Sequence, residues 1–250
     1  NKMNFDIEKF NKEGYLGPFK LNDQPKFNTL LKETYIPRKL YTWYKSPHEK
    51  SAQIVRIASD ENIVDKLRQL LGNDILLWGS LFVNQKPGSE HEWHLDVEHG
   101  SWDGATVWIG LKNLNNQTSV SLITYSHLLN TSPIELYKKN NVDRSNYQVI
   151  LEETKKLDSR CELKTFYLSP GEFIIWSGRT WHATLNKSTK SRQSIILQYC
   201  TPDNVVKIPK NFDFPDTLWS KTKPPCVSIS GIDNFNYNKV LSKADIKHSN

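Results

Sequence analysis

The sequence contains little cysteine. Its three cysteines, Cys161, Cys200 and Cys226, are spread over 250 residues, and no two of them form a CxxC pair. This small, odd and widely spaced set argues against a disulfide scaffold, and it is too small for a zinc site built from four thiolates. We therefore expect a protein of a reducing compartment, and we predict a cytoplasmic location.

Long apolar runs are also absent. No stretch approaches the ~20 apolar residues of a transmembrane helix, and the opening residues NKMNFDIEKFNKEG are too polar for a secretory signal. Lys and Arg number 33 against 27 Asp and Glu, which gives a formal net charge of +6, but the densest basic clusters, LYKKNN and KSTKSR, are short. We expect no membrane, nucleic-acid or obligate protein partner, and the mild positive charge favours a small polar or anionic substrate.

No repeat, low-complexity segment or linker divides the chain, so we predict a single domain over residues 1–250. Residues 1–75 are expected to form a helical N-terminal support. Within them SDENIVDKLRQLLGN predicts a helix, with Ser59 or Asp60 as its N-cap and Gly72 at its end. Residues 201–250 are rich in proline and are expected to wrap around the core.

Residues 76–200 carry the pattern of a β core. Turn residues separate eight apolar, β-branched segments, and loops of this length favour antiparallel pairing. An insert at about 127–158 should hold two short helices, one starting at Pro133 and one covering 146–157. The predicted class is mainly β with flanking helices, a double-stranded β-helix (jelly roll, cupin-like). The predicted strands are Leu76–Asn84, His91–Val97, Ala105–Leu111, Ser119–Tyr125, Glu162–Leu168, Glu172–Trp176, His182–Asn186 and Ser194–Cys200.

The second of these strands is unusually charged. It lies in EHEWHLDV, residues 90–97, where His94 and Asp96 should point to one face about 6.5–7 Å apart. Glu92 and Glu98 share that parity, and His91 and His99 should point to the opposite face. A half-buried strand holds such charge only with a partner for it, and a metal ion is the partner that a histidine and a carboxylate indicate together.

A third ligand must come from a distant strand. His127, in LITYSHLLNTSP, and His182, in SGRTWHATLN, are the two candidates. His127 lies where a strand gives way to a helix and also fits a turn or cap histidine. His182 follows a turn between two strands and is expected at the mouth of the barrel, which favours it.

Ten residues after His182 comes RQS, in which Arg192 and Ser194 share a face of the last strand. A guanidinium and a hydroxyl in this arrangement can hold one carboxylate, although a surface ion pair also explains the arginine. Two histidines and one carboxylate form the facial triad of non-haem Fe(II), which leaves coordination positions open for a keto acid and O2.

Four segments in the same order, FNKEGYLGPF, WHLD, TYSH and GEFIIWSGRTWHATLNKSTKSRQS, cover roughly residues 5 to 200. They resemble the phytanoyl-CoA dioxygenase-like (PhyH) family of Fe(II)/2-oxoglutarate-dependent oxygenases. The resemblance implies that His94, Asp96 and His182 are the catalytic iron ligands. It also implies that Arg192 with Ser194 binds the distal carboxylate of 2-oxoglutarate, and that the cofactors are Fe(II), 2-oxoglutarate and O2.

The same resemblance implies that hydroxylation of an unactivated C–H is coupled to decarboxylation of 2-oxoglutarate to succinate. The substrate would be a small polar or anionic molecule, such as a metabolite, a sugar or a natural-product intermediate. Related halogenases carry Gly or Ala where this chain has Asp96, which disfavours halogenation, whereas desaturation, epimerisation and ring formation stay open. Two alternatives also remain: a non-catalytic jelly-roll binding protein, and a cupin-type metal-dependent isomerase or hydrolase. Neither alternative needs the Arg192–Ser194 clamp.

Overall fold

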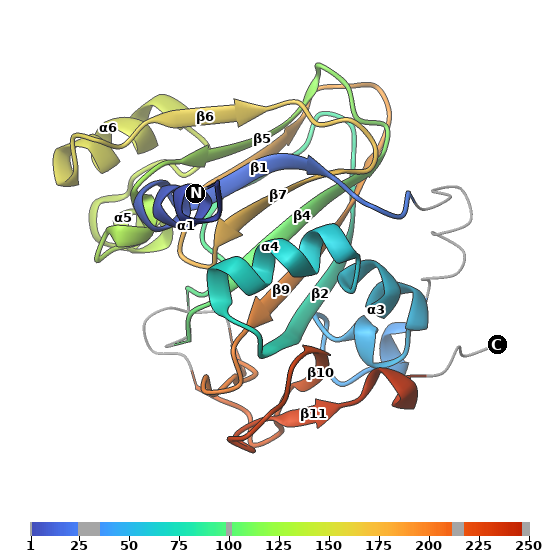
Figure 1. The fold of residues 1–250 in the computed structure, drawn as a ribbon. Coiled ribbons are helices and arrows are strands. Elements are labelled where there is room, and N and C mark those ends of the chain that lie inside the picture. The colour runs from blue at the N-terminus through green and yellow to red at the C-terminus, as the bar shows by residue number, and fades with distance from the viewer. Residues whose placement is uncertain (1, 25–35, 99–101, 212–217, 247–250) are drawn as a thin grey trace.

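Two β-sheets face each other in the computed structural model, which describes residues 2–24, 36–98, 102–211 and 218–246 (Figure 1). The larger sheet holds, in spatial order, β1 (Tyr15–Lys20), β7 (Glu172–Ser177), β4 (Ala105–Lys112), β9 (Arg192–Cys200), β2 (Ile75–Gln85), β10 (Pro225–Ser230) and β11 (Lys239–Leu241). The smaller sheet holds β3 (Glu90–His94), β8 (His182–Asn186), β5 (Thr118–Ile123) and β6 (Leu163–Phe166). Except for β10–β11, the paired strands are antiparallel, so the predicted jelly roll with flanking helices is confirmed.

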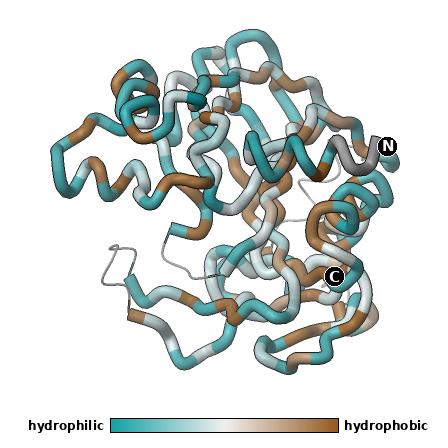
Figure 2. The backbone as a smooth tube through the Cα atoms, turned by 60° about the vertical axis from the view of Figure 1, so that its left-hand side comes forward, coloured by the Kyte–Doolittle hydropathy of each residue, from teal (hydrophilic) through white to brown (hydrophobic). Residues whose placement is uncertain are grey.

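Helices cover the outer face of the larger sheet. In Figure 1, α1 (Lys2–Glu13) and α4 (Glu61–Leu71) lie in front of its strands, with α3 (Ala52–Ala58) beside them. The Asp60 side chain caps α4 by accepting from the Asn62 N–H, and Gly72 ends it at φ 91°, as predicted. Hydrophobic and hydrophilic residues alternate along these helices (Figure 2), and the apolar ones, such as Ile63 and Leu67, pack in one cluster with the sheet.

The insert forms the two helices that were expected. They are α5 (Pro133–Asn140), capped by the Ser132 side chain, and α6 (Tyr147–Leu157), capped by Asn146. Both lie beside β5 and β6 (Figure 1). Short 3-10 turns occur at Arg38–Leu40, Pro47–Glu49, Ser126–Leu128 and Lys243–Asp245.

Three strands were not predicted. The segment YLGPFK was expected to be helical support, but it forms β1 and pairs with β7. The C-terminal wrap contributes β10, which pairs with β2, and β11, which pairs with β10. These strands begin with or contain proline or glycine, or are very short, so their local pattern is weak and pairing with a distant strand decides the structure.

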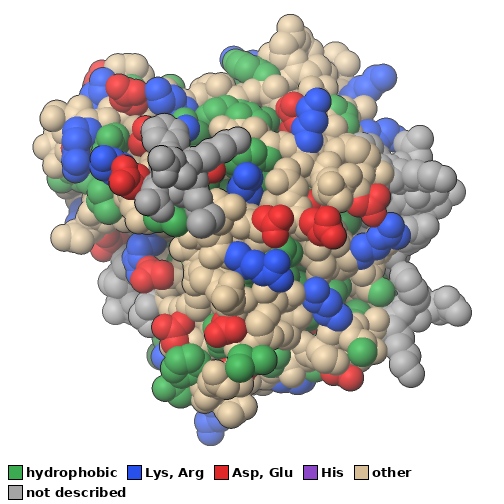
Figure 3. Space-filling model, in the orientation of Figure 1, with side chains coloured by type: hydrophobic (Ala, Val, Ile, Leu, Met, Phe, Trp, Pro, Cys, Tyr) green, Lys and Arg blue, Asp and Glu red, His purple; other side chains and the backbone are tan. Residues whose placement is uncertain are grey.

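The surface carries both charge signs. On the face seen in Figure 3, acidic and basic side chains are interspersed around uncharged ones. Among the described residues no helix is long and apolar enough to cross a bilayer.

A buried histidine joins the N-terminal segment to the larger sheet. His48 is fully buried, and its Nδ1 lies 2.7 Å from the Ser80 hydroxyl of β2 while Nε2 lies 2.8 Å from the Pro225 carbonyl of β10. A carbonyl only accepts, so Nε2 carries the proton and Nδ1 accepts from Ser80. Burial lowers the pKa of His48 to about 4, which keeps this neutral form at pH 7.

Acid should therefore weaken the fold through His48. The unfolded chain binds a proton on this histidine below its ordinary pKa of about 6.5, whereas the folded chain resists protonation down to pH 4, so stability is lost as the pH falls between these values. We expect His48 to account for about 2 kcal/mol of the loss in unfolding free energy between pH 7.5 and 5. Urea unfolding at both pH values measures this. His48→Gln should be less stable at pH 7.5 and should lose less on acidification; an equal loss in both proteins would contradict the assignment.

Candidate active site

The turn between β7 and β8 connects the segment that holds His94 and Asp96 to His182. The strand β3 ends at His94, and Asp96 lies in the turn that follows it. The prediction that this strand continues to Val97 was wrong. The backbone N–H groups of Asp96 and Val97 both donate to the Gly178 carbonyl at 3.1 Å. Gly178 belongs to the turn between β7 and β8, just before His182, and His182 is the partner of His94 in the β3–β8 pairing. This tether brings the carboxylate back beside the two imidazoles.

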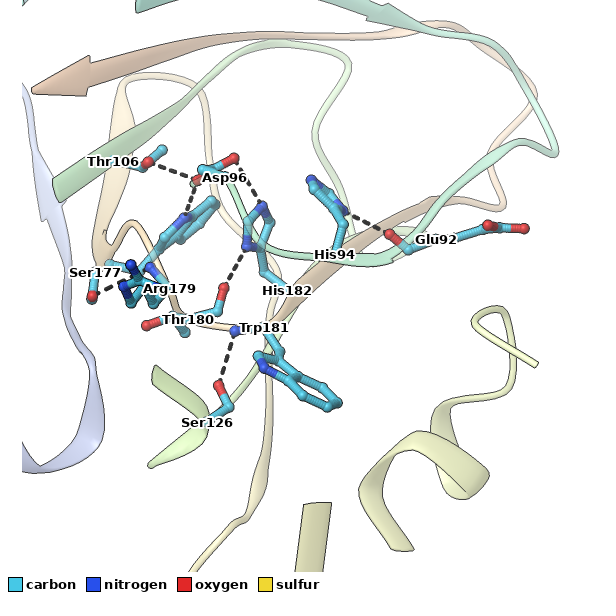
Figure 4. A network of polar contacts seen from close by, with 11 residues as sticks. Glu92, His94, Asp96, Thr106, Ser126, Ser177, Arg179, Thr180, Trp181 and His182 are labelled. Atoms are coloured by element: carbon cyan, nitrogen blue, oxygen red, sulfur yellow. Dashed lines mark hydrogen bonds and ion pairs between the residues drawn. The ribbon is translucent and has the colours of Figure 1, made fainter. Parts of the chain in front are cut away.

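The side chains of His94, Asp96 and His182 converge (Figure 4). Each offers one ligand atom within 4.8 Å of the other two, a separation that suits a single metal ion. The His182 Nε2 lies 3.5 Å from the Asp96 Oδ1, and the two imidazole centroids are 4.2 Å apart. His182 is buried and the other two are partly accessible, so the centre has a closed side and an open side.

Backbone carbonyls orient both imidazoles. The His94 Nδ1 lies 2.7 Å from the Glu92 carbonyl, and the His182 Nδ1 lies 2.8 Å from the Thr180 carbonyl (Figure 4). A carbonyl accepts a hydrogen bond, so each Nδ1 carries the proton and each Nε2 keeps its lone pair for a metal.

Two donors fix the carboxylate. The Asp96 Oδ2 accepts from the Thr106 hydroxyl at 2.7 Å and from the Trp176 indole N–H at 2.9 Å, which leaves Oδ1 toward His182. Neither donor was predicted from the sequence. The register explains how they meet: Thr106 of β4 pairs with Trp176 of β7, so both reach the same turn.

The electrostatics favour the metal-binding protonation state. Burial lowers the pKa of His94 well below its ordinary value, so this imidazole is neutral at pH 7. Burial alone would raise the pKa of Asp96, but the neighbouring His182 and Lys45 hold it below its usual range. A neutral imidazole beside an ionised carboxylate needs no proton release before a divalent ion binds.

Two other histidines, His91 and His127, lie close to the triad or in a neighbouring turn. His91 was expected on the face opposite His94, but the two rings stack with centroids 3.9 Å apart. A bulge between His91 and His94 in the β3–β8 pairing brings both rings to one side. His127, the other candidate for third ligand, lies in the Ser126–Leu128 turn with Nε2 2.9 Å from the Asn11 carbonyl, and it is not part of the triad. His99 lies outside the described residues.

Arg192 and Ser194 lie buried on the inner face of β9, with 1% and 0% of their surface exposed. The Arg192 guanidinium carbon lies 4.8 Å from the centre of the Trp108 ring. Its Nε and Nη1, and the Ser194 Oγ, have no hydrogen-bond partner among the described residues. Burial lowers the pKa of Arg192 to about 10, so the group is still charged at pH 7. A buried cation whose donors have no protein partner fits a site for an anion.

The strand register relates this cation to the triad. Trp108, which packs against Arg192, pairs with Ile196 of β9, and Thr106, which bonds Asp96, pairs with Gln198. Residues two apart on one strand face are separated by about 6.5–7 Å. Trp108, which contacts the guanidinium, therefore lies one such step from Thr106, which bonds Asp96.

A cavity of about 370 Å³ opens on the accessible side of the triad. Its wall includes His94 and Asp96, the inner-face residues Ile196 and Gln198 of β9, and a group of aromatic side chains. Its volume is that of a small-molecule site.

The family model for phytanoyl-CoA dioxygenase (PhyH) matches residues 20–194, more than half of the chain. The chain belongs to the phytanoyl-CoA dioxygenase family. Fe(II) and 2-oxoglutarate are therefore its cofactors, as predicted, and the triad geometry fits the metal. A comparison with curated protein sequences gave no match.

Several solved structures have a similar fold. CytC3 with Fe(II) and alpha-ketoglutarate has 18% identity over 95% of this chain and 92% of that one, with a TM-score of 0.64. EctD from S. alaskensis, with 2-oxoglutarate and 5-hydroxyectoine, has 16% identity over 95% and 86%, with a TM-score of 0.59. The epimerase SnoN from nogalamycin biosynthesis, in complex with Fe3+ and alpha ketoglutarate, has 14% identity over 95% and 97%, with a TM-score of 0.62. At these identities the likeness shows the fold of a PhyH-family oxygenase and not the substrate.

Proposed function

We propose that this oxygenase is a hydroxylase in which His94, Asp96 and His182 bind Fe(II), while Arg192 and Ser194 bind the distal carboxylate of 2-oxoglutarate. The observation that carries the proposal is the buried Arg192 guanidinium, whose Nε and Nη1 lack a hydrogen-bond partner among the described residues. It packs on Trp108, which lies one strand-face step from Thr106, the residue that bonds Asp96. The two alternatives, a binding protein and a cupin-type isomerase or hydrolase, give no reason to bury this charge.

Bound Fe(II), with 2-oxoglutarate and O2, supplies the oxidising chemistry that cleaves a substrate C–H and releases succinate and CO2. The protein holds the parts in place. Carbonyl acceptors fix both imidazoles, and Thr106 with Trp176 fixes the carboxylate. The cavity then presents a substrate to the one side of the triad that the sheets leave open.

Asp96 favours hydroxylation over halogenation. Halogenases of this family have Gly or Ala at the position, which admits a halide, whereas here a carboxylate is fixed by two hydrogen bonds with its Oδ1 directed to the metal side. The halide position is thus filled by a protein ligand.

Turnover tests the proposed function directly. The protein with Fe(II), 2-oxoglutarate and O2 should form succinate in the presence of members of a library of small polar and anionic molecules. Mass spectrometry in excess chloride should show a product heavier than its substrate by one oxygen, which derives largely from 18O2. A chlorinated product, or one lighter by two hydrogens, would replace hydroxylation by another oxidation. Complete absence of succinate, with or without substrate, would favour a non-catalytic binding protein.

A further inference from the structure

The cavity beside the triad has a continuous aromatic wall. Successive ring centroids along the wall lie 5.4, 6.5, 5.4 and 6.1 Å apart. All five rings line the cavity that also reaches His94 and Asp96. A substrate at the triad therefore lies beside aromatic rings. In order, the aromatic wall consists of Tyr44, Trp43, Trp78, Trp102 and Trp219.

The C-terminal segment completes this wall. Trp219 pairs with Pro209 in an isolated β-bridge, and the bridge is extended by hydrogen bonds from Lys210 N to Leu218 O at 2.7 Å and from Ser220 N to Ile208 O at 2.8 Å. This ladder holds Trp219 and Lys207 at the cavity. Both residues follow residue 194, where the match to the family model ends, so they are features of this chain beyond the family pattern.

Two lysines, Lys45 and Lys207, line the cavity. Among the described residues no carboxylate lies within ion-pair distance of Lys45 or Lys207. The Lys45 ammonium lies 5.4 Å from the centre of the Trp78 ring, and the Lys207 ammonium lies 5.6 Å from that of Trp219. Lys45 is near enough to Asp96 for the two charges to influence each other, so it lies at the metal end, whereas Lys207 is exposed and lies at the rim.

Two other charged residues of the cavity, Arg144 and Glu98, interact with neighbouring segments. The Arg144 Nη2 lies 2.9 Å from the Glu92 carboxylate. Glu98 interacts with the Ser132 hydroxyl and with the Ile134 backbone N–H at the start of α5, but its Oε1 has no hydrogen-bond partner among the described residues, and burial raises its pKa to about 7. Lys45 interacts with Asp96, so Lys207 at the rim is the cation that remains for a ligand.

On the basis of the proposed function, we propose that the substrate is an organic acid with a planar ring, selected by the C-terminal segment. The ring packs on the aromatic wall, and the acidic group pairs with Lys207 at the rim, while Lys45 adds positive potential at the metal end. An aromatic wall alone would also suit a cationic ligand, but the positive charge of Lys207 at the rim disfavours one. Trp219 and Lys207 are thus specificity-determining residues.

Calorimetric titration of the Ni(II)- and 2-oxoglutarate-loaded protein tests this assignment without turnover. The probes are 2-naphthoate, the neutral 2-naphthamide, and cyclohexanecarboxylate, an acid without a planar ring. We expect 2-naphthoate to bind about tenfold more tightly than either of the others. Lys207→Met should weaken 2-naphthoate about fivefold and leave 2-naphthamide unchanged.

Trp219→Leu should weaken both naphthalene probes, and Trp219→Phe, which keeps a ring, should restore most of the affinity. Lys239→Met changes an exposed lysine on β11, away from the cavity, and should alter nothing. Equal binding of 2-naphthoate and 2-naphthamide, or competition of 2-naphthoate with 2-oxoglutarate, would overturn the proposal.

The test separates this proposal from the hydroxylase proposal. Selective binding of 2-naphthoate without any succinate formation would support the proposed acid-binding site and contradict the hydroxylase proposal. Succinate formation without a preference for the acid would support the hydroxylase proposal and contradict the proposed acid-binding site.

Discussion

Alanine in place of His182 should abolish iron-dependent succinate formation and weaken Fe(II) binding by more than about 100-fold. The reason is that changes to residues that merely orient metal ligands cost about 10–100-fold in affinity, so loss of a ligand should cost more. His94→Ala should behave in the same way, because His94 and His182 pair across β3 and β8 and offer ligand atoms to one point. The measurement is an anaerobic titration that follows the visible charge-transfer band of Fe(II) chelated by 2-oxoglutarate.

His127→Gln is the matched control. His127 is a histidine from the neighbouring turn, its Nε2 is directed to the Asn11 carbonyl, and it lies outside the triad. The band and the iron stoichiometry should survive this change. If His94→Ala and His182→Ala each left the band intact while remaining folded by circular dichroism, the metal would have to be bound elsewhere.

The sequence predicted the β core because its pattern there is local. Strands β2, β4, β7, β8 and β9 are apolar runs bounded by turn residues, and their observed limits differ from the predicted ones by at most two residues. The helix α4 was predicted from its cap and its terminal Gly72, and α5 from Pro133 in its first turn. β1 and β10 escaped prediction because each forms only by pairing with a strand far away in the chain.

For the triad, too, the local sequence predicted one part of the structure, and contacts with distant segments determined the rest. Residue types and order predicted that His94, Asp96 and His182 would lie together, and they do. The expected unbroken strand with strict alternation was wrong. The bulge in β3 and the tether to the Gly178 carbonyl depend on β8 and on the turn before it, which alternation along one segment does not reveal.

The cavity was the least predictable part. Lys45, Lys207 and Trp219 come from segments that are far apart in sequence and are joined only by the folded chain. Trp102 lines the cavity, whereas Trp176 lies in the core and also donates to Asp96. The sequence shows where the tryptophans stand in the chain, but only their packing in the fold shows which of them line the cavity and which lie in the core.

Replacement of Arg192 by methionine should weaken 2-oxoglutarate by about 10–100-fold while Fe(II) binding survives. Hydrogen bonds to charged groups contribute about 1.5–3 kcal/mol, which corresponds to this range. Methionine keeps much of the side-chain volume beside Trp108, so packing changes little. Ser194→Ala should cost less, because its hydroxyl contributes one neutral donor. Arg160→Met, which changes an exposed arginine paired with Asp158, is the control.

A co-substrate analogue decides whether Arg192 acts through the distal carboxylate. 2-Oxovalerate keeps the keto acid that faces the metal and lacks the second carboxylate. It should bind the unmodified protein weakly, and Arg192→Met should not weaken it further, so that the two keto acids become nearly equal in the variant. Anaerobic titration of each keto acid into the Fe(II)-loaded protein gives the four affinities. Equal losses for both keto acids would mean that Arg192 supports the fold of the barrel and does not bind the co-substrate, since only a contact with the missing carboxylate makes the two changes non-additive.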